Sequence, residues 1–185
     1  MKFLKYLILL FCLIYGCYTH GPYIKFERDF SPGDSSVTMA VLNFDYSGNF
    51  LSAQIALQAA DNLTSEIFVK KGIRVIDRSL VKEILKRYEK SKTSRLSKED
   101  IIKIGQDLGA NYLVLGSIQS TGSIDDYYES RDYKIEITLR FIDATSSKVV
   151  GIIKHRMVDD SEVEIIVNRV IKEIVFYMRG WINLA

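Results

Sequence analysis

Runs of apolar residues predict five strands between residues 37 and 157. Two of the runs are almost entirely apolar, which is typical of strands buried on both faces. Another run alternates apolar and polar residues from Tyr133 to Ile142, and a turn at 143–147 joins it to a hairpin partner. The predicted strands cover 37–44, 73–76, 112–118, 133–142 and 148–157.

Apolar residues spaced three or four positions apart predict four helices around these strands. Residues at capping-box spacing open two of them, at Ser97–Asp100 and Ser161–Glu164. The element order β-α-β-α-α-β-β-β-α predicts a single-domain α/β sandwich with a mixed sheet. The predicted helices cover about 50–70, 80–88, 97–108 and 161–178.

The N-terminus has the pattern of an export signal. Lys2 and Lys5 precede an apolar run of ten residues, which is about half the length of a membrane-spanning helix. The ending Ile14-Tyr15-Gly16-Cys17 resembles a bacterial lipobox, in which cleavage before the cysteine is followed by its acylation. An ordinary secretory signal is the alternative. We expect lipid on Cys17 to hold the mature protein on a membrane.

Between Cys17 and the first strand lies a segment without an apolar period. It contains both prolines, Pro22 and Pro32, and the pattern favours a flexible tether. Tyr23–Phe26 is the alternative within it, as an added edge strand or a contact for a partner. The sequence thus divides into a signal peptide (1–16), a lipidated cysteine with its tether (17–36) and a folded domain (37–185).

Charge and cysteine content exclude several functions. Without Lys2 and Lys5, the 25 basic residues of the chain become 23, which equals the number of acidic residues. A formally neutral mature chain predicts no nucleic-acid partner. Only Cys17 would remain of the two cysteines, so neither a disulfide nor a cysteine metal site is expected.

Candidate catalytic groups are few, and we expect no enzyme, no cofactor and no metal. His155 lies between Lys154 and Arg156, and we expect it to be a surface imidazole. Asp77-Arg78 precedes a helix, where the carboxylate is expected to cap the helix and the guanidinium to pair with a nearby acid. Ser79 is expected to be a helix cap.

The candidates for contact with a partner protein are acidic and aromatic. Tyrosine and tryptophan offer a large contact area at low entropic cost. A solvated hairpin loop is the alternative for the first four, and a cover over the end of the last helix is the alternative for the tryptophan. The candidates are Asp125, Asp126, Tyr127, Tyr128 and Trp181.

Four segments in this order resemble the CsgG-like family of bacterial envelope lipoproteins, with its LpoB-like and FlgO-like relatives. They read VTMAVLNF, IRVIDRSLVKEILKRYE, KIGQDLGANYLVLGSIQ and ITLRFIDATSSKVVGIIKH. Channel members of that family carry two long pore hairpins. Here residues 120–132 give only an acidic loop with serine and glycine breakers, and the second insertion point is shorter still.

The resemblance implies a non-enzymatic envelope lipoprotein that acts as an accessory or assembly factor. The alternatives are a subunit of a secretion complex whose pore another protein forms, and an activator of a cell-wall synthase. A homo-oligomer is also open. The residue after Cys17 is Tyr18 rather than an aspartate, which would act as a retention signal. This points to the outer membrane, with the protein facing the periplasm. The inner membrane and the cell surface are the alternatives.

Overall fold

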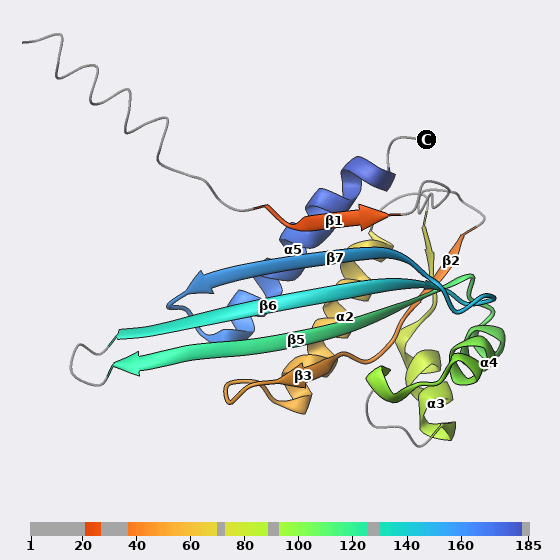
Figure 1. The fold of residues 1–185 in the computed structure, drawn as a ribbon, viewed down its shortest axis with the longest axis horizontal. Coiled ribbons are helices and arrows are strands. Elements are labelled where there is room, and N and C mark those ends of the chain that lie inside the picture. The colour runs from red at the N-terminus through yellow and green to blue at the C-terminus, as the bar shows by residue number, and fades with distance from the viewer. Residues whose placement is uncertain (1–20, 27–36, 70–72, 89–92, 126–129, 183–185) are drawn as a thin grey trace, which may run out of the picture.

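The computed structural model describes residues 21–26, 37–69, 73–88, 93–125 and 130–182 (Figure 1). Their seven strands form one mixed sheet in the order β1-β7-β6-β5-β2-β4, and β3 pairs with β5 off this path. The strands are β1 (Tyr23–Phe26), β2 (Thr38–Val41), β3 (Asp45–Ser47), β4 (Arg74–Val75), β5 (Tyr112–Asp125), β6 (Ser130–Asp143) and β7 (Val149–Asp159). The helices are α2 (Ala53–Phe68), α3 (Arg78–Arg87), α4 (Lys98–Leu108) and α5 (Val163–Ile182), with a 3-10 turn at Thr93–Arg95. The predicted single-domain α/β class with a mixed sheet is confirmed.

The larger core lies between the sheet and the helices α2 and α5. Every second side chain of β6 is fully buried there, from Ile135 to Phe141. The predicted stripe of α5 is buried on the same core, including Val170, Ile174 and Met178. This confirms the alternation in β6 and the amphipathic pattern of the last helix, because each element turns its apolar side toward the other.

A smaller core lies on the opposite face, at one end of the sheet. There α3 and α4 cover Ala40 of β2, Leu42 just after it, and Leu113 and Leu115 of β5. In Figure 1 the strands β1, β7, β6 and β5 run in front of α2 and α5, while α3 and α4 lie at the right-hand end. The remaining front face of β1, β7 and β6 has no helix over it.

The strand β1 joins the sheet at the edge of β7. Its register is antiparallel, from Tyr23 opposite Lys154 to Phe26 opposite Gly151. The Phe26 ring packs edge-on against Phe141 at 5.3 Å between ring centroids, and it occupies the space that a Cβ on Gly151 would fill. The favoured prediction of a flexible tether is therefore wrong for these four residues, and the alternative of an edge strand is confirmed.

Two other segments extend the sheet beyond the predicted strands. The predicted turn at 45–49 begins with β3, held because the Asp45 carboxylate accepts the backbone N–H groups of Thr93 at 2.9 Å and Ser94 at 2.7 Å. The strands β5 and β6 remain paired out to Asp125 opposite Ser130. The prediction of a loop over 120–132 is therefore wrong at both ends of that segment. Backbone pairing between the two strands continues there, although the alternation of apolar and polar side chains has stopped.

The helix ends follow the predicted caps in one case and not in the other. Ser97 and Asp100 form both hydrogen bonds of a capping box, and Gly109 ends α4 in the left-handed conformation, with φ at 60°. The second predicted box is wrong. The Glu162 carbonyl accepts the first helical N–H groups of α5, so the helix begins one position later than Ser161 requires.

A buried arginine connects three elements at the carboxyl end of β2. Arg78 is 8% exposed and donates to the Val41 carbonyl at 2.5 Å, to Asn43 Oδ1 at 2.8 Å and to Asp61 Oδ1 at 2.8 Å. Asp77 is the N-cap of α3 and accepts the Ser79 N–H at 2.8 Å. The structural interpretation of Asp77-Arg78 is thus confirmed, but the cap is Asp77 rather than Ser79.

Replacing Arg78 with alanine should lower the free energy of unfolding by about 2–4 kcal/mol, because it leaves buried acceptors unpaired. Urea unfolding of residues 18–185 measures this. The matched control is Arg87→Ala, which breaks an exposed pair with Glu83 and should cost about 0.5 kcal/mol or less. Equal losses in the two variants would contradict the role of Arg78.

Candidate functional site

The one histidine among the described residues is buried and paired with a carboxylate. His155 is 5% exposed, and its Nε2 lies 2.6 Å from Glu173 Oε2 on α5. The prediction of a surface imidazole is therefore wrong. The period of β7 carried the missed signal, because Ile153, His155 and Met157 share a face and Ile153 belongs to the core.

An open groove of about 660 Å³ lies beside this pair, between β7 and α5. Its apolar wall on α5 is exposed, with Phe176 at 61% and Tyr177 at 40%. The strand β1 covers β7 only as far as Lys154, so residues 155–159 form a sheet edge without a neighbouring described strand. The groove is lined by Gly21, His155, Arg156, Met157, Val158, Glu173, Phe176 and Tyr177.

The groove lining combines the imidazole of His155, the carboxylate of Glu173 and the hydroxyl of Tyr177 with apolar side chains. Serine, threonine and cysteine, the usual nucleophiles beside a His–acid pair, are not among its lining residues. Within the described ranges no three His, Cys, Asp or Glu side chains are grouped to hold a metal. His155 and Glu173 instead connect β7 to α5.

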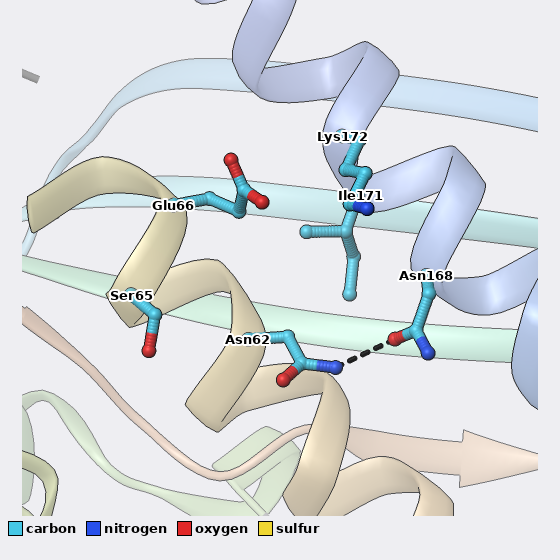
Figure 2. A pocket seen from close by; sticks show the side chains of 6 residues that line it. All are labelled: Asn62, Ser65, Glu66, Asn168, Ile171 and Lys172. Atoms are coloured by element: carbon cyan, nitrogen blue, oxygen red, sulfur yellow. Dashed lines mark hydrogen bonds between the residues drawn. The ribbon is translucent and has the colours of Figure 1, made fainter. Parts of the chain in front are cut away.

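A second, polar groove of about 240 Å³ separates α2 from α5 (Figure 2). Asn62 donates to Asn168 Oδ1 at 2.6 Å across it, and Gln58 donates to Glu164 at 2.8 Å further along the same helices. These bonds join the two helices over the sheet. Two of the six lining residues, Asn62 and Asn168, are thus already used to join the helix pair.

A third hollow, of about 430 Å³, lies beside Arg78 at the end of α2. Its rim is apolar and exposed, with Phe68 at 71% and Val69 at 73%. Partial burial acts to raise the pKa of Asp61, but hydrogen bonds from Lys82 and Arg78 outweigh it, so the pKa is lowered. Asp61 therefore stays ionised at neutral pH and holds both cations.

The turn between β7 and α5 is fixed by a carboxylate. Asp159 accepts the Ser161 N–H at 2.8 Å and pairs with Arg169 of α5. Hydrogen bonds from Ser161, followed by Arg169, lower the pKa of Asp159 to about 2. This turn places α5 over His155.

The structure brings together none of the predicted partner-binding residues in a describable site. Asp125 ends β5 and pairs with Ser130, and Trp181 falls in the last turn of α5. The positions 126–128, with Asp126, Tyr127 and Tyr128, lie outside the described residues, as does Cys17. Their roles stay predictions. No described helix is long and apolar enough to cross a membrane.

Comparison with known sequences assigns the family. Residues 53–150, from the start of α2 to the start of β7, match the family model described as peptidoglycan-synthase activator LpoB. This match covers more than half of the chain. The chain belongs to the LpoB family. Among curated protein sequences there is no match.

Solved structures share the fold of this LpoB-family chain at low identity. Lipoprotein GNA1162 from Neisseria meningitidis has a TM-score of 0.56 at 11% identity, over 78% of this chain and 99% of that one. A PelC dodecamer variant from Paraburkholderia phytofirmans has a TM-score of 0.53 at 11% identity, over 83% and 94%. Protein CT253 from Chlamydia trachomatis has a TM-score of 0.50 at 14% identity, over 79% and 97%.

Membership in the LpoB family bears out the expected class of function. The chain is an accessory protein of the bacterial cell envelope, and the family description matches the alternative of a cell-wall synthase activator. The family named by the match is one of the relatives in the expected resemblance.

The lowered pKa of Asp159 predicts how stability depends on pH. An aspartate in the unfolded chain has a pKa of about 3.9, so the stability contributed by Asp159 is complete above that value. It is lost as the pH falls from about 4 toward 2. In urea unfolding, the stability difference between the wild type and Asp159→Asn should be constant above about pH 5 and shrink below pH 4.

The control for this series is Asp160→Asn, at the exposed neighbouring residue. Its difference from the wild type should stay small and should not follow this titration. A stability difference for Asp159→Asn that is the same at pH 6 and pH 3 would contradict the assignment.

Proposed function

We propose that this chain activates a peptidoglycan synthase from a lipid anchor at Cys17, on the outer membrane and facing the periplasm. The observation that carries the proposal is the match of residues 53–150 to the peptidoglycan-synthase activator family. The export signal and the lipobox-like Ile14–Cys17 support the anchor. The mechanism is binding, because the grooves hold paired polar groups and apolar walls rather than a reactive set.

Pairing of β1 with β7 shortens the tether that the sequence predicted. Only residues 18–22 separate Cys17 from the first paired residue, Tyr23. Five extended residues span at most about 18 Å, against about 60 Å for the whole segment 18–36. The anchor thus holds the domain near the membrane surface. Such confinement raises the effective concentration at a partner in the same membrane system, so a modest affinity suffices.

A CsgG-like ancestry without a pore is the finer form of this proposal. The element order and the hairpins of the domain support it, and the β5–β6 hairpin extends past the end of β7 by the pairs Ser123–Asp132 to Asp125–Ser130. We propose that this extension forms a short arm of the domain in place of a pore hairpin.

A subunit of a homo-oligomeric export assembly is the second candidate. The sheet has unpaired edges at β4 and at residues 155–159 of β7 among the described strands, which a second copy would be able to extend. The similar fold of PelC occurs in a dodecamer. Light scattering separates the candidates, because a strict monomer favours the tethered activator.

The activator proposal predicts a gain in synthase activity. Residues 18–185, added to the purified bifunctional peptidoglycan synthases of the source bacterium, should raise the rate of glycan polymerisation by one of them several-fold. In cells, wild-type protein should incorporate a labelled fatty acid, whereas Cys17→Ala should not.

The matched control is Cys12→Ala, which removes the other cysteine and should leave labelling unchanged. Label retained in Cys17→Ala would exclude the anchor. Unchanged polymerisation by every synthase tested would exclude activation.

A further inference from the structure

The part of one sheet face that β1, β7 and β6 form, which we call the open face, has no described helix over it. It consists of outward side chains of β1, β7 and β6, opposite the side covered by α2 and α5. The strand registers arrange these side chains in four rows across the sheet. From one end, the rows are Arg140–Ile152–Lys25, Thr138–Lys154–Tyr23, Glu136–Arg156 and Lys134–Val158.

The open face concentrates positive charge on a chain that is otherwise balanced. Its four rows hold five cations and one carboxylate, and the exposed Asp132 lies on the same side of β6 just beyond Lys134, so the net charge is +3, although the chain after Lys2 and Lys5 has equal numbers of basic and acidic residues. The carboxylate, Glu136, pairs with Lys154 at 2.9 Å. The other four cations form no ion pair with any residue that the structure describes. They are Lys25, Lys134, Arg140 and Arg156.

Apolar side chains lie between these charges. Tyr23 is 58% exposed and Val158 is 61% exposed, and Ile152 separates Arg140 from Lys25 within one row. Tyrosine and arginine are the residues that contribute most to protein interfaces. An arginine guanidinium also binds a carboxylate through two parallel hydrogen bonds.

We propose that the open face binds an acidic surface of a protein, the peptidoglycan synthase, and this rests on the proposed function. Charge complementarity indicates the chemistry of the partner. Its surface would carry carboxylates opposite the four cations without a described ion pair, and apolar groups opposite Tyr23, Ile152 and Val158. Attraction between the two surfaces speeds association and fixes the orientation of the domain.

A protein fits this face better than an anionic membrane. A lipid surface rewards cations and repels a carboxylate within a Debye length of it, whereas Glu136 stands in the middle of the patch. Within each row the neighbouring strands are about 5 Å apart, so the charged and apolar side chains stand at fixed spacings. A folded protein can place its own groups at matching positions, whereas lipid headgroups move independently and cannot hold such a pattern.

The test is charge reversal in one row, Lys25→Glu with Arg140→Glu, in the full-length lipoprotein bound to the synthase in detergent. Lys25 is exposed and Arg140 is half-buried, and neither forms an ion pair with a described residue, so the melting temperature should stay close to that of the wild type. The dissociation constant should rise at least tenfold. The weakening of wild-type binding between about 50 and about 500 mM salt should be reduced in the variant.

The matched control is Lys103→Glu with Lys172→Glu, which changes the net charge equally. Lys103 is on α4, and Lys172 lines the α2–α5 groove. Its affinity should stay within about twofold of the wild type. An equal loss in this control would overturn the proposal, since binding would then follow net charge or the surfaces of α4 and α5.

Two further outcomes separate the inference from the function. If the wild type activates the synthase and the Lys25/Arg140 variant binds as tightly, the inference fails and the function stands. If the wild type binds no synthase, the function fails and the inference with it. Amine labelling of Lys25 in phosphatidylglycerol vesicles, compared with phosphatidylcholine vesicles, tests the lipid alternative. Protection by phosphatidylglycerol without synthase would overturn a protein partner.

Discussion

The two-residue period of β6 and β7 is the constraint on which this domain depends. One set of side chains is closed off by α2 and α5, including Leu139 and Ile153 with no exposure. The other set must then face away from the core, where Arg140, Lys154 and Arg156 lie. A slip of one residue would exchange the two sets and bury the cations. The fold and the charged face are thus two results of the same register.

Helix placement decides how much of the outward set remains accessible. The helices α3 and α4 reach the outward side over β2, the first half of β5 and the end of β6, around Ala40, Leu115 and Ile142. The rest of that side is bordered by β1, which the Phe26 contacts hold against Phe141 and Gly151. β1 therefore has two roles. It adds Tyr23 and Lys25 to the open face, and its pairing with β7 leaves only residues 18–22 between this strand and Cys17.

The sequence predicted the elements whose reasons are local. Alternation in β6 and the Ser97–Asp100 box depend on neighbouring residues, and both are confirmed. The residues of β1 and β3 were not sufficient to predict these strands, because what holds them is distant in the chain: Phe141 for β1 and the Thr93 and Ser94 N–H groups for β3.

The functional residues divide in the same way. The period of β7 was sufficient to place His155 beneath α5, and its charged neighbours concealed that signal. The acid partner of Arg78 was expected, but its bond to the Val41 carbonyl depends on how α3 meets β2. The open face needed the register of three strands, because Lys25 and Arg140 are far apart in sequence.

Reactivity of lysine amines in the complex with the synthase measures the central claim most directly. The full-length lipoprotein is labelled with an amine reagent, alone and bound, and the rate at each lysine is compared by mass spectrometry. The account predicts slower labelling at Lys25, Lys134 and Lys154, with unchanged rates at the exposed Lys86, Lys103 and Lys172. Protection of Lys172 with the open face unchanged would place the interface on α2 and α5 and contradict the account.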